Sequence, residues 1–313
     1  MVKNTKFNKT FLGHGQIPLT NDIVFFLVYG AGTKESNRAL VALLNVVLER
    51  GNDPIAGVKV ANTVHKGFRP GDKETVMDIK ARSQAGEQFN VEMQASVQPS
   101  YGERTLAYGA RMVNSSLAKG EDYATMKKSI VISFIDGVMF KSTPRFHTEF
   151  GLRDSSGGLL LTDRLEVHFL ELGKIDGSKE PGGMAPLERF CAYLKFAGDH
   201  RKEGYVDKLL DTGEEAILMS DQVFRDVTED ESLQDLLWRR EVAEHDLATK
   251  LRLAEKDGER LGIEQGIERG IAAFVQDYAE DGRPCEVIIE KLRLRFGLDQ
   301  EAARQYYEKY GKA

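Results

Sequence analysis

The sequence predicts an α/β domain followed by an α-helical C-terminal region. Three observations lead to this prediction: two apolar helical patterns come first, a hairpin of alternating polar and apolar residues spans 75–96, and no strand pattern follows residue 175. Helices interleaved with strands are typical of a sheet covered by helices. We expect a polar N-terminal arm over 1–17, the α/β domain over 18–200 and the helical region over 201–313.

The first two helices are predicted from capping residues and apolar spacing. Thr20, Asn21 or Asp22 can each cap a helix that runs through the apolar segment 23–30. A second helix over 37–50 carries leucine and valine at the spacing of one helical face. Both helices therefore have an apolar surface to bury.

The strands and one further helix follow in order. We expect a first strand over 58–64, then the hairpin, then a helix over 99–120. The run 129–140 is densely apolar and β-branched at its start, which indicates a strand buried on both faces. Another strand is expected over 165–175.

From about residue 181 the pattern changes to charged helices, predicted over 186–198, 205–210 and 229–280, with two or three short helices in the tail. A Gly-rich charged segment, 256–271, lies inside the longest of them. Its glycines recur every four residues, at Gly258, Gly262, Gly266 and Gly270. Glycine weakens a helix by roughly 1 kcal/mol per residue. We therefore expect either a seam where two helices approach closely or a flexible linker.

Composition and charge exclude several classes of protein. Apolar residues make up 41% of the chain and charged residues 29%, and the net charge is −6. The acidic balance argues against binding nucleic acid through overall charge, so such binding needs a local basic patch. The two cysteines lie far apart and the six histidines are scattered, which predicts no disulfide framework, hydrolase triad or zinc site. Without an apolar signal segment or long apolar run, we expect a soluble cytoplasmic protein.

The hairpin carries the strongest candidates for catalytic or metal-binding side chains. Strand side chains alternate, so Asp78 lies on one face of the first strand, and Glu92 and Gln94 share a face of the second. Gly86 indicates a tight turn, and a register centred near Ala85 would set Asp78 opposite Glu92. Two carboxylates at that separation repel each other unless a cation lies between them, and oxygen ligands suit Mg²⁺ or Mn²⁺. The same alternation also fits an ordinary half-exposed strand.

Short motifs along the chain resemble, in order, those of a known nuclease family. They are Asn21-Asp22 opening an aromatic helix, Leu44-Asn45, Met77-Asp78, VEMQ at Val91–Gln94, and then ERTLAYGARM, KGEDY and HFLELGK. The set resembles the Rpn family of recombination-promoting nucleases, which are also described as transposases of the PD-(D/E)XK superfamily. The ordered set covers most of the chain, although each motif alone is weakly specific.

The resemblance implies a restriction-endonuclease-like core and a metal-dependent endonuclease that acts on DNA. Asp78 and Glu92 match the metal-binding carboxylates, and the backbone carbonyl of Met93 is a further candidate ligand for Mg²⁺ or Mn²⁺. Gln94 matches the position where the superfamily more often has lysine and this family has glutamine. Its amide would orient the attacking water or a phosphate oxygen.

Three cationic or aromatic residues are candidates for contact with DNA phosphate. Arg104 and Tyr108 match an R-x-x-x-Y element that follows the hairpin in the family. Alternatively, Arg104 pairs with a carboxylate and Tyr108 packs on the sheet. Lys80 lies two residues from Asp78 on the same face, where it could replace the missing lysine or be a solvated strand residue.

One departure from the family concerns the first helix. The family pattern there is D-x-x-F-K, whereas this chain has Asp22 followed by Phe25 and Phe26. The lysine has become Phe26, which would weaken the site if that lysine binds DNA. Asp22 is a candidate outer ligand through water, and helix capping is the alternative.

We therefore expect a Mg²⁺-dependent DNA endonuclease that forms a homodimer through its helical C-terminal region. The alternative is a PD-(D/E)XK scaffold with little or no catalytic activity that binds DNA or protein. A third reading is an assembly protein driven by the charged helices. The acidic charge and Phe26 favour the scaffold, whereas the carboxylate pair favours the enzyme.

Overall fold

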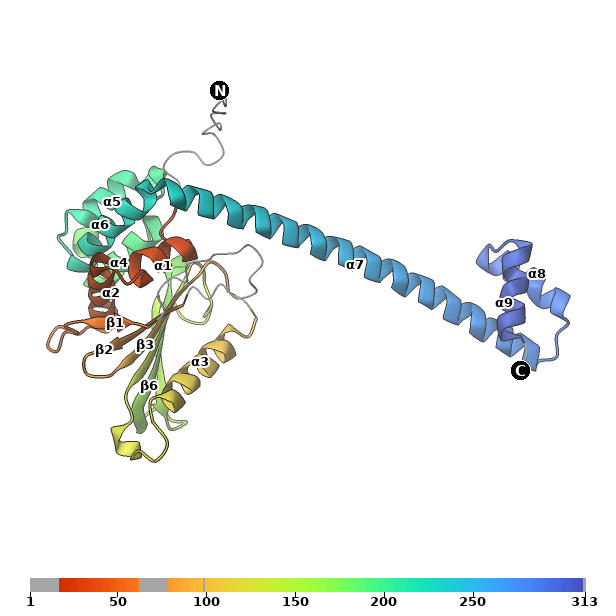
Figure 1. Ribbon diagram of the computed structural model, residues 1–313, viewed down its shortest axis with the longest axis horizontal. Coiled ribbons are helices and arrows are strands. Elements are labelled where there is room, and N and C mark those ends of the chain that lie inside the picture. The colour runs from red at the N-terminus through yellow and green to blue at the C-terminus, as the bar shows by residue number, and fades with distance from the viewer. Residues whose placement is uncertain (1–16, 62–77, 98, 312–313) are drawn as a thin grey trace, which may run out of the picture. The chain divides into compact units, whose positions relative to one another are not determined.

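The computed structural model describes most of the chain, namely residues 17–61, 78–97 and 99–311 (Figure 1). The predicted N-terminal arm, apart from residue 17, lies outside the described residues. So do the end of the predicted first strand and the beginning of the hairpin, including Val76 and Met77. The chain forms two compact units, Met1–Trp238 and Arg239–Ala313.

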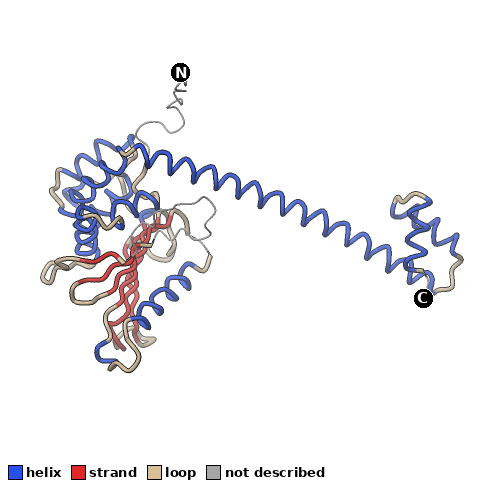
Figure 2. Tube along the Cα trace, viewed as in Figure 1, coloured by secondary structure: helices blue, strands red, loops and turns tan. Residues whose placement is uncertain are grey.

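A six-stranded mixed sheet forms the centre of the first unit, and Figure 2 shows the strands together there. The strands, in chain order, are β1 Val58–Val60, β2 Ile79–Ser83, β3 Gln88–Gln94, β4 Ser129–Ile135, β5 His147–Arg153 and β6 Leu160–Glu171. Their order in the sheet is β1-β2-β3-β4-β6-β5. Strand β4 runs parallel to both β3 and β6, and the other neighbours are antiparallel. The predicted α/β class is confirmed.

The predicted hairpin is present with the predicted register. Ile79 pairs with Val91 and Arg82 with Gln88, which centres the turn on Ala85. Gly86 takes a φ of 90°, a left-handed conformation that glycine adopts without a steric penalty. The alternation of side chains along the two strands therefore decides which residues face the site.

The helices of the first unit cover both faces of the sheet. They are α1 Asp22–Gly30, α2 Lys34–Val47, α3 Tyr101–Ser115, α4 Pro186–Phe196, α5 Glu203–Leu210 and α6 Glu215–Glu229. Helix α3 lies against one face, and α1, α2, α4 and α6 pack on the other, where they enclose the main core with Val91 and Ile132 (Figure 1). Gly109 allows α3 to approach closely, because a Cβ there would lie 2.8 Å from the Leu165 side chain.

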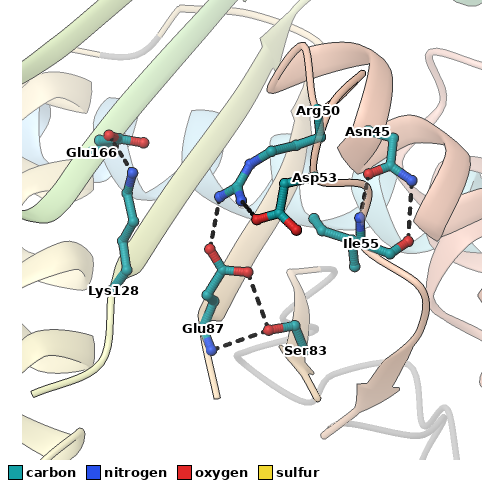
Figure 3. A network of polar contacts seen from close by, with 8 residues as sticks. All are labelled: Asn45, Arg50, Asp53, Ile55, Ser83, Glu87, Lys128 and Glu166. Carbon is teal, nitrogen blue, oxygen red and sulfur yellow. Dashed lines mark hydrogen bonds and ion pairs between the residues drawn. The ribbon is translucent and has the colours of Figure 1, made fainter. Parts of the chain in front are cut away.

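Local signals explain the beginning of α1 and the loop after α2. Asn21 caps α1, because its side-chain oxygen accepts hydrogen bonds from the backbone N–H groups of Ile23 and Val24 at 3.0 and 3.2 Å. Asn45 near the end of α2 holds the following loop. Its amide accepts from the N–H of Ile55 at 2.7 Å and donates to the carbonyl of Ile55 at 3.1 Å (Figure 3).

The first unit extends to Trp238, beyond residue 200 where the sequence predicted its end. Helices α5 and α6 belong to its core, since Leu209 and Ile217 are fully buried in the main cluster. The hydroxyl of Tyr29 in α1 also donates a 2.8 Å hydrogen bond to Ser220 in α6. The composition becomes more charged after residue 181, but the apolar faces of these helices still complete the core.

The sequence missed β5. Only Thr148 in this strand is buried, so no alternating apolar pattern marks it. It forms an edge of the sheet, where main-chain hydrogen bonding to β6 rather than side-chain burial defines the strand. The run 129–135 is buried at every position, as predicted, and no described residue after Glu171 is in a strand.

The second unit packs two short helices against the end of a long one. Helix α7 spans Glu231–Glu280, and α8 Cys285–Phe296 and α9 Gln300–Tyr310 enclose a small core with it. The glycines of segment 256–271 lie within α7, and a Cβ at each would meet nothing within 4 Å. None of the described helices is both long enough and apolar enough to cross a membrane.

Candidate active site

The centre of the candidate site is Glu92, on the α3-facing side of β3. This residue is 1% exposed. Oε1 accepts a 2.7 Å hydrogen bond from the Tyr101 hydroxyl, and Ser133 Oγ lies 3.5 Å from the same oxygen. Oε2 accepts a 3.1 Å hydrogen bond from Nε2 of Gln94. A buried carboxylate held from three elements is a preorganised ligand.

Asp78 lies opposite Glu92. It immediately precedes β2, and the pairing of Ile79 with Val91 continues by one residue to set Asp78 against Glu92. Burial raises the pKa of Glu92 to about 7, and the charge of Asp78 acts in the same direction. The structure thus brings together the two carboxylates that the sequence placed on one face.

Tyr101 and Arg104 counter the negative charge only in part. Both act to lower the pKa of Glu92, but burial and Asp78 outweigh them. Two neighbouring carboxylates of which one is buried stay ionised together only when further positive charge is supplied. The donor set, two carboxylates with a neighbouring amide, fits a hard dication such as Mg²⁺.

Arg104 projects from α3 toward Glu92. Its Nη2 lies 3.6 Å from Glu92 Oε2, and its side chain is 34% exposed. The guanidinium carbon lies 4.7 Å from the centre of the Tyr101 ring and 6.0 Å from that of Tyr108. Its Nε is buried without a hydrogen-bond partner. Arg104 thus forms an ion pair with Glu92, and Tyr108 lies half-buried beside the guanidinium. Contact of Arg104 with a DNA phosphate stays a prediction.

Two residues that sequence reasoning did not select also belong to this face. Ser133 lies opposite Glu92 on β4, through parallel pairing that no local pattern could predict. Asn90 is 1% exposed, and neither its amide nitrogen nor its amide oxygen has a hydrogen-bond partner. Buried amides are nearly always paired, so Asn90 marks a place for water or ligand. The sequence did contain a signal for Asn90, because a residue two positions before Glu92 in a strand lies on the same face of the sheet.

Two further predicted residues are Lys80 on β2 and Asp22 at the beginning of α1. Lys80 is exposed on β2, opposite Asn90 and on the same strand face as Asp78. Asp22 begins α1, where its carboxylate accepts from the N–H of Ile23 at 2.9 Å, although Asn21 is the cap.

Met93 points its side chain into the main core, which leaves only its backbone for the role predicted from the family. Phe26 is 7% exposed in the same core. Its ring lies close to Gly30, where a Cβ would come within 3.0 Å of it. The residue that replaces the family lysine is therefore a packing residue.

A comparison with known protein families finds a match over most of the chain. A family model described as PD-(D/E)XK nuclease family transposase matches residues 19–254. That range contains the whole sheet, the hairpin carboxylates and α3. No match was found among the curated proteins or among the solved structures.

Proposed function

Because the chain belongs to the PD-(D/E)XK nuclease family of transposases, we propose that it is a Mg²⁺-dependent endonuclease that hydrolyses DNA phosphodiester bonds. The observation that carries the proposal is the buried Glu92 carboxylate facing Asp78. Nucleases of this type generally use divalent metal ions. We propose further that it is a recombination-promoting nuclease of the Rpn family.

Asp78 and Glu92, with the backbone carbonyl of Met93, would hold Mg²⁺ or Mn²⁺. When bound, the ion would lower the pKa of a water molecule and neutralise charge on the phosphorus centre. Tyr101 and Gln94 hold the two oxygens of Glu92 at 2.7 and 3.1 Å, so the carboxylate is oriented before substrate arrives. The Gln94 carbonyl oxygen has acceptor capacity with which to orient the attacking water.

Arg104 would bind the scissile or a neighbouring phosphate. Its contact with Glu92 at 3.6 Å is longer than a hydrogen bond, and its Nε has no partner. The fork therefore has donors to give to a phosphate oxygen. Lys80 and Tyr108 are further candidates for phosphate contact, and Asp22 for an outer ligand through water. These local groups would compensate for the acidic net charge of −6.

Nicking of supercoiled plasmid by the full chain tests the proposal. We expect nicking with Mg²⁺ that EDTA stops and that Asp78→Asn and Glu92→Gln abolish. Glu103→Gln is the matched control, because Glu103 is an exposed carboxylate on α3. Equal nicking by wild type and the two site variants would remove the assignment. Calorimetry with Mg²⁺ and Mn²⁺ tests the scaffold alternative, for which no binding at millimolar ion is expected.

We also propose that two chains associate through the helical region 201–313, since cutting both DNA strands requires two sites. Large apolar side chains are exposed along α7 in support, among them Trp238, Leu247, Leu251, Leu261 and Ile263. Sedimentation of the full chain should give a dimer that Leu247→Glu with Leu251→Glu converts to a monomer. Leu159→Glu, at an exposed leucine of the first unit, should leave the dimer intact. A monomeric wild type would contradict this proposal.

A further inference from the structure

A second group of metal-ligating side chains lies on β5 and β6. Glu149, Glu166 and His168 each offer one ligand atom, and these atoms all lie within 4.8 Å of one another. Glu149 pairs with His168 across the two strands. Glu166 precedes His168 by two residues and so shares its face of the sheet.

His168 is the member that points to a ligand. It is 3% exposed, and its Nδ1 lies 3.0 Å from Nε2 of His147 within a stacked ring pair. Its Nε2 is buried without a hydrogen-bond partner and lies 3.8 Å from Oε2 of Glu166. That separation is too long for a hydrogen bond, and leaving a buried ring nitrogen unpaired is costly.

His147 is a hydrogen-bond partner for the second ring nitrogen of His168, Nδ1. Ligating imidazoles nearly always donate their second ring N–H to a hydrogen-bond partner, which orients the ring. If His168 Nδ1 donates to His147, then the Nε2 lone pair faces Glu166. In this tautomer a lone pair and a carboxylate face each other and could both bind a dication placed between them, whereas in the other tautomer the Nε2 proton lies between them.

Glu166 is held in place from its other side. Lys128 Nζ lies 2.5 Å from Oε1 of Glu166 (Figure 3). The other carboxylate oxygen, Oε2, is the one that lies 3.8 Å from His168 Nε2. Glu149 is exposed and can adjust its rotamer to bring its oxygen to the distance of about 2.1 Å that Zn²⁺ takes from carboxylates. Two of the three ligands are thus fixed and the third is adaptable.

An ion can reach this group from solvent. An open depression of about 580 Å³ is lined by His147, Glu149, Asp163 and Glu166, among others. The group is separate from the candidate active site, because Glu92, Ser133 and Phe169 share one face of the sheet. His168 directly precedes Phe169 and therefore faces the other way.

We propose that Glu149, Glu166 and His168 bind a transition-metal dication of the Zn²⁺ class at a second site that fastens the edge strand β5 to β6. An imidazole with two carboxylates suits Zn²⁺, whereas Mg²⁺ is bound by oxygen ligands. Sequence spacing predicted no zinc site, because the ligands come from two strands that pair only in the folded sheet. The proposal is independent of the nuclease assignment.

The test uses the full chain carrying Glu92→Gln, which disables the proposed Mg²⁺ site and leaves the second site intact. After EDTA stripping, titration with ZnCl₂ against a chromophoric chelator should show one bound ion per chain. Glu149→Gln and Glu166→Gln should each weaken its binding by at least about tenfold. Asp163→Asn is the matched control, since Asp163 lines the same depression outside the ligand group.

Two further readouts separate a bound ion from an ion-pair cluster. X-ray absorption at the zinc edge should show imidazole scattering. Zinc should also raise the melting temperature of the Glu92→Gln protein, but not when Glu149→Gln is added. Glu149 is exposed, so this variant should fold even if a substitution at buried His168 does not. Absence of bound zinc, or binding unchanged by both glutamate substitutions, would overturn the proposal.

Discussion

The hydroxyl of Tyr101 donates a 2.7 Å hydrogen bond to Oε1 of Glu92, which joins the first turn of α3 to the C-terminal half of β3. Tyr101 is 3% exposed and Glu92 is 1% exposed, so water does not replace this bond easily. The bond favours the ionised carboxylate, while burial and Asp78 oppose ionisation. Glu92 is therefore held in the position that metal binding requires, and a bound dication would supply the positive charge that keeps it ionised.

Tyr101→Phe should destabilise the protein without a loss of packing. The ring and its edge contact with Phe169 are kept, but one buried oxygen of Glu92 loses its donor. We expect a loss of about 1–3 kcal/mol in the free energy of unfolding, measured with urea. Tyr123→Phe at an exposed tyrosine is the control. Equal stability of Tyr101→Phe and wild type would show that the bond contributes nothing.

Glu92→Gln should stabilise the metal-free protein above neutral pH. The pKa of Glu92 is raised from 4.5 to about 7 in the folded state, so the unfolded chain loses this proton first as pH rises. Stability from this group is therefore lost between about pH 4.5 and 7, by the order of 3 kcal/mol. The variant cannot ionise there and escapes that loss.

Urea unfolding in EDTA at pH 5 and pH 8 measures this effect. The wild type should lose more stability over that interval than Glu92→Gln, and Glu103→Gln should behave as the wild type. Saturating Mg²⁺ should reduce the difference, because a dication supplies the charge that the ionised pair lacks. A pH dependence identical in wild type and Glu92→Gln would contradict the raised pKa of Glu92 in the folded protein.

Arg104→Ala should lower nicking while leaving metal binding intact. Removal of a charged donor from a transferring phosphate reduces the rate by at least about tenfold. Mg²⁺ affinity should be unchanged or higher, because the guanidinium lies 3.6 Å from the carboxylate that would bind the ion. Arg111→Ala, an exposed arginine on the same helix, is the control. Weaker Mg²⁺ binding with normal nicking would assign Arg104 a role in orienting Glu92 instead.

Phe26→Lys should destabilise the fold and not increase activity. Phe26 is 7% exposed in the main core, where a lysine would lose the packing of the ring and bury its charge. We expect a loss of about 3 kcal/mol or more in unfolding free energy, and a distinctly smaller one for Phe26→Leu. Higher nicking by a stable Phe26→Lys protein would show that this position still belongs to the site.

Much of the first unit could be predicted because its signals are local. The cap at Asn21, the turn at Gly86 and the buried run 129–135 each depend on neighbours in the chain. The end of this unit could not be predicted in the same way. Helices α5 and α6 look charged. Only the packing of α6 against α1 and α2, and of α5 against α4 and α6, shows that they belong to the core.

By itself, the sequence determined the hairpin and its register, and hence that Asp78 lies opposite Glu92. Both depend on short-range properties, namely side-chain alternation along each strand and the tight turn that connects them. Only the tertiary structure decided which groups surround Glu92. Tyr101 and Ser133 come from a helix and a parallel strand that no local pattern aligns. The same holds for His168 and Glu149, since pairing of an exposed edge strand depends on main-chain hydrogen bonds that leave no trace in side-chain periodicity.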